Sequence, residues 1–320
     1  MSASERKATR IPRELAGLRA VQALATLFPD YSRSRIQAWM KSGNVRIDDR
    51  AARPRDRVAG GELVVLSVAP AESPDWSAEA GSLDVLHEDE WILVVDKPAG
   101  LVMHPGAGNR DGTLANLLLH HDPGLSAVPR SGIVHRLDKD TSGLVVVART
   151  LGAHRALVEA IGERAVSREY EAIVDGVMTA AGVVDAPIGR HRIQRTRMAV
   201  TAAGKRSVTH YVPLRRYRAH TRVGLRLETG RTHQIRVHMA HIGHPVVGDP
   251  AYRGRRHSSP GGCSDDLRAT LGGFRRQALH AVRLALTHPG TGTPMEWRSP
   301  LTGDIRALLA ALEADAERVR

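Results

Sequence analysis

The stretch GIVHRLDKDTSGLVVVART, Gly132–Thr150, joins a strongly charged segment directly to a strongly apolar one. Both signs of charge crowd into His135–Asp140, which we term the charged hexapeptide. The run Leu144–Ala148 follows Gly143 and predicts a buried strand. The charged hexapeptide is therefore expected at the mouth of a strand that enters a core. A functional site and a solvated loop with weak surface ion pairs both fit this pattern.

The charge balance is the main constraint that composition provides. The 320 residues include 46 Lys and Arg against 34 Asp and Glu, which gives a net charge of +12. This excess of cations predicts a polyanionic partner, bound through phosphate contacts and counterion release. With only 4 Trp, 5 Tyr and 2 Phe, an aromatic platform for single strands is not expected.

The remaining composition indicates a soluble, cytoplasmic protein without a membrane segment. No apolar run has the length of a membrane span, and the first residues contain no apolar core of a signal peptide. Residues 1–12 are polar and basic, and we expect a disordered tail there. The single cysteine, Cys263, excludes a disulfide framework, and its Gly/Ser/Pro-rich surroundings predict exposure.

A linker is predicted at residues 69–83, APAESPDWSAEAGSL, because Ala, Pro, Ser and acidic residues dominate it without periodicity. Residues 13–68 form a small domain with two helical apolar patterns followed by two short strands. This domain is rich in basic residues, and we predict a phosphate-binding face there rather than an ordinary solvated one. The basic residues concerned are Arg33, Arg35, Lys41, Arg46, Arg50, Arg53, Arg55 and Arg57.

Residues 84–320 form the larger domain, in which short apolar runs alternate with turns. Several runs are separated by too little chain for a helical crossover, so we predict an α+β fold with a mainly antiparallel, mixed sheet. The expected strands are Trp91–Val95, Leu144–Ala148, Tyr170–Val174, Val208–Pro213, Val223–Leu227 and Gln234–Val237. The expected helices lie near Gly112–His121, near Ala153–Gly162 and from Asp304 onward.

Four closely spaced histidines raise the question of a metal site, since imidazoles can share one ion. We predict no metal, because Thr232–His238 alternates like a strand and would place His233 and His238 on opposite faces. No carboxylate follows until Asp249.

A carboxylate of the charged hexapeptide is the strongest candidate nucleophile. Ser142 stands in no nucleophile elbow, and no serine triad is visible. An Asp attacks only when ionised, and neighbouring arginines favour that form. Arg136 is the local cation, and a second could come from Gly230–Arg236.

Several separated segments resemble the RluA family of pseudouridine synthases. In chain order they are VVDKPAGLVMHPGAG, GIVHRLDKDTSGLVVVART, SREYEAIVDG, ETGRTHQIRVHMAHIGHPVVGDPAY and RQALHA. These motifs span nearly the whole larger domain. The small domain, with FPDYSRSRIQAWMKSG, VRID and GGELVVL, resembles the S4-type RNA-binding domain. Its presence, together with RQALHA, favours the branch that modifies large-subunit ribosomal RNA.

The resemblance implies roles for individual residues. The family's catalytic aspartate falls on Asp138 rather than Asp140, and its neighbouring arginine falls on Arg136. Tyr170 is implied to stack on the target base and to assist proton removal.

Within Gly230–His238, the resemblance implies Arg236 as the ion-pair partner of Asp138, with Arg231 as the second candidate. Residues implied or expected to bind substrate or RNA are Ile235, Arg231, His233, Arg155, Arg33, Arg35, Lys41 and Arg46.

The function implied is isomerisation of specific uridines to pseudouridine, in 23S ribosomal RNA, by a monomer without metal or cofactor. The base must leave its stack before it reacts, so base flipping is expected. Two alternatives stay open: a transfer RNA synthase of the same family, and a non-catalytic RNA-binding factor for ribosome assembly. The second alternative accounts for the charge but gives no reason for Asp138 or Tyr170.

Overall fold

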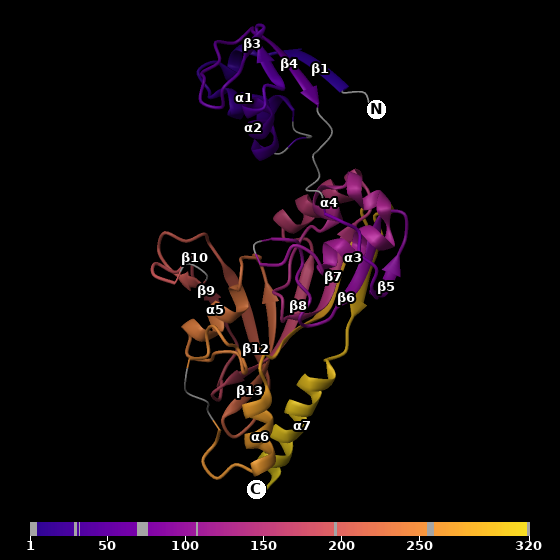
Figure 1. Ribbon diagram of the computed structural model, residues 1–320. Coiled ribbons are helices and arrows are strands. Elements are labelled where there is room, and N and C mark those ends of the chain that lie inside the picture. Colours follow the sequence, from indigo (N-terminus) through magenta and orange to yellow (C-terminus); the bar gives the residue numbers. More distant parts are fainter. Residues whose placement is uncertain are drawn as a thin grey trace. The chain divides into compact units, whose positions relative to one another are not determined.

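A computed structural model describes residues 5–28, 31, 33–68, 76–106, 108–194, 197–254 and 259–318. The chain divides into two compact units, Met1–Asp75 and Trp76–Arg320 (Figure 1). The division falls within the predicted linker, of which residues 69–75 lie outside the described part. Trp76 already packs against the core of the second unit. The larger unit therefore begins before residue 84.

The small unit contains a four-stranded antiparallel sheet in the order β1-β4-β2-β3, counted over its described residues. The strands are β1 (Glu5–Arg10), β2 (Val45–Ile47), β3 (Arg50–Ala51) and β4 (Leu63–Val68). The helical elements are η1 (Arg13–Leu15), α1 (Ala20–Leu27) and α2 (Arg33–Lys41). The prediction of a disordered tail is wrong for Glu5–Arg10, because these residues pair along the whole of β4.

Apolar residues at helical spacing hold the small unit together. Leu24 of α1 and Ile36 of α2 are each 1% exposed, and they share a core with Leu66 of β4. Burying a side chain of this size contributes about 1.5–3 kcal/mol. Because the apolar faces turn inward, the basic residues of the unit remain outside.

The larger unit is built on one sheet, in which nine described strands take part. The order is β5-β6-β7-β14-β8-β13-β12-β9, with β15 paired to β14. The strands are β5 (Asp84–Glu88), β6 (Ile92–Lys97), β7 (Ser142–Ala148), β8 (Ser167–Asp175), β9 (Gly182–Asp185), β12 (Val208–Arg216), β13 (His220–Leu227), β14 (Leu279–Thr287) and β15 (Pro294–Arg298). Only the β7–β14 pairing is parallel among these strands. The predicted mainly antiparallel, mixed sheet is confirmed.

Strand β7 is buried along its whole length, as its continuous apolar run predicts. On one face of the sheet, Val146 packs with Leu157 of α4 (Leu151–Gly162). On the other face, Val145 packs with Leu118 of α3 (Leu114–His121). Helices on both faces thus exclude water from the strand that follows the charged hexapeptide.

Gly143 is required where β7 meets β14. It adopts φ +112°, and a Cβ atom there would lie 2.3 Å from the carbonyl oxygen of Ala281. Any side chain would therefore force the two strands apart. The close approach anchors the C-terminal end of the Gly132–Gly143 loop to the centre of the sheet.

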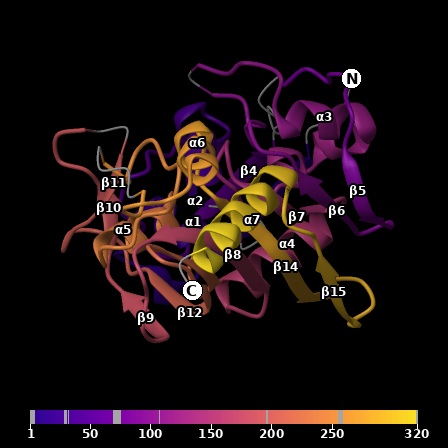
Figure 2. The same ribbon diagram turned by 90° about the horizontal axis from the view of Figure 1, so that it is seen from below.

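Two C-terminal helices pack against each other at one side of the sheet (Figure 2). They are α6 (Asp265–Gly273) and α7 (Gly303–Glu317), and α7 begins close to the predicted Asp304. Leu267 and Leu308, both 0% exposed, join the main core. Cys263 is 7% exposed, so the expected exposure of this cysteine is wrong. Within the described residues, no helix is both long and apolar enough to cross a membrane.

The segment predicted as strand Gln234–Val237 is instead α5 (Gln234–His241). Its alternation of polar and apolar residues misleads because Gln234, Arg236 and His238 are buried together with Ile235 and Val237. Buried polar side chains with hydrogen-bond partners break the usual rule that polar residues face solvent. A two-stranded ribbon, β10 (Ile188–Arg190) with β11 (Met198–Val200), completes the described elements near this helix.

Candidate active site

Asp138 lies in the loop that leads into β7, and the fold fixes the backbone around it. The Thr141 backbone N–H donates to the Asp138 carbonyl at 3.0 Å, which closes a tight turn. Leu137, 3% exposed, is buried in the main core immediately before it. One side of the turn is thus anchored by packing, which leaves the Asp138 carboxylate at the surface of the core.

Arg236 is the ion-pair partner of Asp138. Its Nη1 lies 2.9 Å from Asp138 Oδ2, although 98 residues separate the two in sequence. Asp249 binds the same guanidinium from the other side: Arg236 Nε donates to Oδ2 at 2.7 Å and Nη2 to Oδ1 at 2.9 Å. A bidentate arginine–carboxylate contact fixes the plane of the guanidinium as well as its position. Asp249 therefore directs Nη1 toward Asp138.

The electrostatics of this triad keep Arg236 charged. Burial lowers the pKa of the Arg236 guanidinium, but the hydrogen bonds and charge of Asp249, with those of Asp138, outweigh it and raise the net pKa. This cation lies 2.9 Å from Asp138 and forms a charge-assisted hydrogen bond with its carboxylate. An ionised carboxylate is the form that a nucleophile needs.

His233 and Tyr252 border the ion pair. His233 caps α5 with φ +57°, and its Nδ1 lies 2.7 Å from the Tyr252 hydroxyl. Its Nε2 lies 3.9 Å from Asp138 Oδ1. Burial lowers the pKa of His233, against the opposing effect of Asp138. The Tyr252 ring stacks on Arg236, with 5.1 Å from Cζ to the ring centroid, so it supports the guanidinium on one face.

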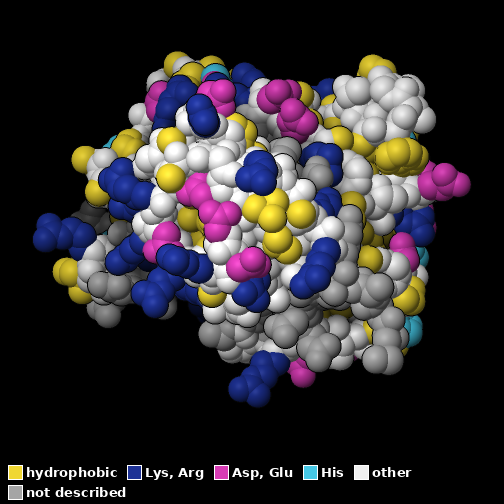
Figure 3. Space-filling model, turned by 90° about the horizontal axis from the view of Figure 1, so that it is seen from above, with side chains coloured by type: hydrophobic (Ala, Val, Ile, Leu, Met, Phe, Trp, Pro, Cys, Tyr) yellow, Lys and Arg dark blue, Asp and Glu magenta, His cyan; other side chains and the backbone are white. Residues whose placement is uncertain are grey.

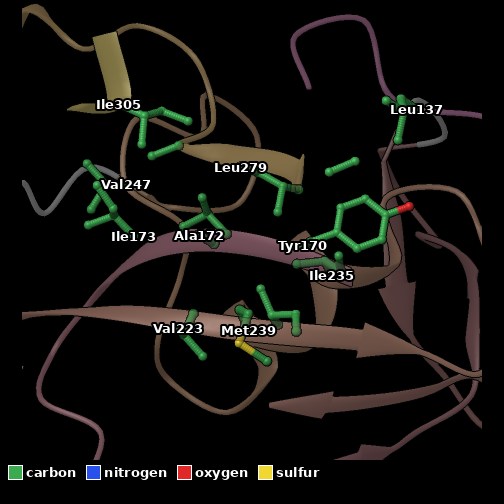
Figure 4. Close-up of a cluster of buried hydrophobic side chains, with 14 of the residues drawn as sticks. Leu137, Tyr170, Ala172, Ile173, Val223, Ile235, Met239, Val247, Leu279 and Ile305 are labelled. Carbon is green, nitrogen blue, oxygen red and sulfur yellow. The ribbon is translucent and has the colours of Figure 1, made fainter. Parts of the chain in front are cut away.

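Tyr170 provides an aromatic ring beside the carboxylate. It lies on β8, 5% exposed, and packs in the same core cluster as Leu137 and Ile235. Figure 4 shows the Tyr170 ring next to Ile235 with its hydroxyl turned toward the Leu137 end of the cluster. Burial raises the pKa of the Tyr170 hydroxyl, and the charge of Asp138 raises it further, while Arg168 opposes the shift. The ring and Ile235 form an apolar floor next to a carboxylate.

Lys97 anchors the other side of the charged hexapeptide. Its Nζ, in a residue only 1% exposed, donates to the carbonyls of Pro98, Leu101 and Lys139 at 2.8–3.0 Å. Burial lowers the pKa of Lys97 to about 8, although the charges of Asp140 and Asp138 oppose this. The three hydrogen bonds replace the water that the ammonium loses. Asp140 and Asp138 both lie close enough to Lys97 for their charges to act on its ammonium.

The other predicted site residues of the larger unit do not contact the Asp138 carboxylate. Arg136 is exposed and has no ion pair within the described residues. Arg231 is also exposed, and its Nε donates to the Arg206 carbonyl at 3.4 Å. Of the two candidate partners of Asp138, the structure therefore selects Arg236. Arg155 lies exposed on α4.

Of the predicted residues in the small unit, Arg33, Lys41 and Arg46 are exposed. Arg35 lies in α2, but its side chain is outside the described part of the chain. These residues belong to the other unit, and each unit is described by itself.

Sequence reasoning missed Asp249, Tyr252 and Lys97 as parts of the site. The sequence Gly248-Asp249-Pro250 indicates a turn but not a part of the site. The Asp249 carboxylate accepts hydrogen bonds from the backbone N–H groups of Ala251 and Tyr252, as Asp does in a tight turn. Lys97 gave no signal beyond its place at the end of an apolar strand.

The arrangement favours chemistry on a planar, uncharged ring. It offers the Asp138 carboxylate, a fixed cation that binds this carboxylate, and an apolar floor formed by the Tyr170 ring and Ile235. The described residues include no group of three or more His, Cys, Asp or Glu that could hold a metal ion. The four closely spaced histidines from His233 to His244 do not form such a group: His238 contacts Thr209 and the Ala186 carbonyl, and His244 contacts the Asp175 carbonyl.

Comparison with known proteins places this site in a family. Residues 91–241 match the model described as RNA pseudouridylate synthase. The chain is 54% identical over 317 residues to the ribosomal large subunit pseudouridine synthase D of Pseudomonas aeruginosa, covering 99% of both chains. It is 52% identical over 302 residues to the protein of the same name from Escherichia coli K12, covering 94% of this chain and 92% of that one.

A solved structure shares the fold of the larger unit. Human RNA pseudouridylate synthase domain containing 4 superposes with a TM-score of 0.55 at 27% identity, over 72% of this chain and 92% of that one. Identity above 50% over nearly the full length leaves one conclusion. The chain belongs to the RluA family of RNA pseudouridylate synthases.

Proposed function

We propose that this protein isomerises uridines of large-subunit ribosomal RNA to pseudouridine, with Asp138 as the nucleophile. The observation that carries the proposal is the contact of Arg236 Nη1 with Asp138 Oδ2 at 2.9 Å, beside the buried ring of Tyr170. The relatives named ribosomal large subunit pseudouridine synthase D supply the substrate class. The reaction needs no metal or cofactor.

In the proposed chemistry, Asp138, Arg236 and Tyr170 each have a separate role. The N1–C1′ bond of uridine breaks, C5 forms a bond to C1′, C5 loses a proton and N1 gains one. Asp138 attacks C1′ of the ribose, which displaces N1, or adds to C6 of the uracil, or assists a glycal intermediate; any bond that Asp138 forms breaks again before the product leaves. Arg236 pairs with the carboxylate and orients it. Tyr170 stacks on the flipped base, and its hydroxyl assists removal of the C5 proton by passing a proton on through water toward N1, so that the hydroxyl itself ends protonated.

The small unit is proposed to be an S4-type RNA-binding domain. The support is its four-stranded sheet with two helices and the exposure of its basic side chains, among them Arg53, Arg55 and Arg57. Figure 3 shows one face of the molecule, over which many Lys and Arg side chains are distributed in dark blue. Dispersed cations suit a backbone that carries one phosphate per nucleotide.

Pseudouridine mapping of ribosomal and transfer RNA from cells that lack the gene tests this function. Loss of modification at sites in 23S ribosomal RNA, restored by the wild-type gene, is the expected result. Loss only in transfer RNA would transfer the proposal to that substrate. Unchanged maps with retained binding to ribosomal RNA would favour a non-catalytic assembly factor. The proposal further takes the protein as cytoplasmic and monomeric. Light scattering of the purified protein checks the monomeric state.

A further inference from the structure

Arg168 is a buried arginine without a hydrogen-bond or ion-pair partner among the described residues. It lies on β8, two residues before Tyr170, and is 6% exposed. Its Nε is fully buried without a hydrogen bond. Within the described part of the chain, no hydrogen bond or ion pair of Arg168 is found.

The other buried arginines of the larger unit show how unusual this is. Arg236 is bound bidentately by Asp249, and Arg253 is bound bidentately by Asp175 at 2.7 and 2.9 Å. Removing a guanidinium from water is costly unless a carboxylate or equivalent group replaces the lost solvation. Arg168 has lost most of its water and has received no such group.

Arg168 is surrounded by the segments that build the active site. Alternate residues of β8 face one side, so Arg168 and Tyr170 both point to the side of the main core. Its charge acts on both Tyr170 and His135 of the charged hexapeptide. Its Nη1 lies 3.1 Å from the point where a Cβ atom on Gly230 would stand, and Gly230 begins the loop to His233. The absence of a side chain there leaves room at the guanidinium.

A second unpartnered donor lies in the same surroundings. His135 Nε2 accepts a hydrogen bond from the Val146 backbone N–H at 3.0 Å, so Nδ1 carries the proton of the neutral ring. This Nδ1 is fully buried and has no acceptor. Burial, and then the charge of Arg168, lower the pKa of His135 to about 3. The histidine is therefore neutral and offers one N–H.

Among the described residues no anion compensates the Arg168 guanidinium, so we expect one that arrives from outside and reaches the guanidinium through its Nη groups. The Nη groups of Arg168 are not among the fully buried unpartnered atoms, so they keep access to solvent. A forked cation of this kind matches a phosphodiester, whose two free oxygens accept in parallel. A neutral uracil carbonyl would satisfy one N–H but would leave the buried charge without compensation.

We propose that Arg168 binds the RNA phosphodiester adjacent to the target uridine and so holds the flipped nucleotide against Tyr170. The inference rests on the proposed function and assigns one more residue to it, as a positioning residue for the substrate backbone. Arg168 itself makes no contact with Asp138 and takes part in no bond change.

Binding measurements test the inference without requiring catalysis. Fluorescence anisotropy follows unmodified 23S ribosomal RNA transcript binding to the full-length protein over a series of KCl concentrations. Arg168→Gln should weaken binding and reduce the slope of log K against log [salt] by about 0.7–0.9, the loss of one phosphate contact. The matched control is Arg226→Gln, because Arg226 lies exposed on the opposite face of neighbouring β13. This control should leave both slope and affinity unchanged.

A neutral backbone linkage identifies which phosphate is bound. Synthetic hairpins spanning a uridine that the wild-type protein modifies carry one methylphosphonate, on the 5′ or the 3′ side of that uridine. One of the two should lower kcat/KM of the wild type about tenfold or more, and the same linkage should lower kcat/KM of Arg168→Gln less than twofold further. Arg168→Lys should recover part of the affinity but not the full linkage preference.

Stability measurements keep the result interpretable. Because the cation has no partner among the described residues, Arg168→Gln should melt at or above the temperature of the wild type. If Arg168→Gln does not fold, the test rests on the wild type alone. The inference is then overturned if neither methylphosphonate lowers kcat/KM of the wild type. An equal linkage penalty in wild type and Arg168→Gln, or an unchanged salt slope, also overturns it. Failure of the proposed function appears separately, as absence of pseudouridine despite an Arg168-dependent salt slope.

Discussion

Asp249 binds two nitrogens of Arg236 and leaves the third, Nη1, for Asp138 at 2.9 Å. Asp249 is 3% exposed and Arg236 is 6% exposed, so this contact is shielded from water and from salt. The position of the Arg236 guanidinium beside Asp138 thus depends on a residue 111 positions later in the chain than Asp138. The orientation of Asp138 depends on Asp249 through this arginine.

Asp249→Asn is expected to reduce both activity and stability. The amide cannot accept from both Nε and Nη2, and the buried guanidinium loses its compensating charge, which costs about 3 kcal/mol. Urea unfolding should report that loss, and kcat should fall about tenfold or more with a smaller change in KM. The control is Asp265→Asn, whose exposed ion pair with Arg268 contributes less than about 1 kcal/mol. Wild-type kcat in Asp249→Asn would show that the orientation of Arg236 is unimportant.

Tyr170→Phe separates stacking from proton transfer. The ring and its packing on Ile235 remain, while the hydroxyl is lost. If the hydroxyl assists proton removal, kcat should fall about 10²-fold or more, with RNA affinity within twofold of wild type. Single-turnover assays and anisotropy measure the two quantities, with Tyr211→Phe on β12 as the control. A kcat within threefold of the wild type would limit Tyr170 to stacking.

Periodicity predicted β6, β7, β8 and β13, because their apolar faces match their burial. It also predicted β12, although Val212 and Leu214 of that strand are 47% and 49% exposed. It did not predict β5, β9, β14 or β15. It failed at α5, where Gln234 and His238 are buried with Thr209 of β12 as hydrogen-bond partner, and Arg236 is buried with Asp249. These partners lie outside the helix, so no local pattern could reveal that the buried polar side chains of α5 have hydrogen-bond partners. The same limit applies to the tail, since β1 is polar in sequence and is recognisable only by pairing with β4.

Two residues of the candidate site, Asp138 and Arg236, could be predicted from the sequence. The resemblance selected Asp138 over Asp140 and named Arg236 as its partner, and the structure brings these two together. It did not reveal Asp249, because an acid after a glycine and before a proline is typical of turns. Arg136 was expected as a support for Asp138, but its side chain is exposed and not paired with it within the described residues.

Gly143→Ala should destabilise the protein strongly. The new Cβ would meet the Ala281 carbonyl oxygen at 2.3 Å, and φ +112° is unfavourable for any side chain. Strand separation at β7–β14 should cost about 2 kcal/mol or more, measured by urea unfolding. Gly272→Ala in α6 has open space and should be neutral or stabilising by about 0.5–1 kcal/mol. Similar stabilities for both variants would contradict the close packing at Gly143.

Stability should decrease as the pH falls below about 6.5. Burial lowers the pKa of His135 to about 3 and that of His104 to about 4, whereas both titrate near 6.5 when unfolded. Between these values the unfolded chain binds more protons, so each histidine contributes up to about 1.4 kcal/mol of lost stability per pH unit. The loss is complete only below the folded pKa values.

His135→Asn should flatten this dependence between pH 7.5 and 5.5, measured as the free energy of unfolding in urea. His120→Asn, at an exposed position of α3, is the control. An unchanged slope in His135→Asn would show that the protonation of this ring is not linked to folding.

The most direct test of the central claim is turnover by Asp138→Asn, measured as pseudouridine formed in a single-turnover assay on 23S ribosomal RNA transcript. Asn keeps the shape of the side chain but cannot act as an ionised nucleophile. Asp140→Asn, beside Lys97 in the same charged hexapeptide, is the matched control and should retain activity. We predict no detectable pseudouridine from Asp138→Asn, with RNA affinity within about threefold of the wild type. Product formation by Asp138→Asn at a rate near that of the wild type would contradict the account.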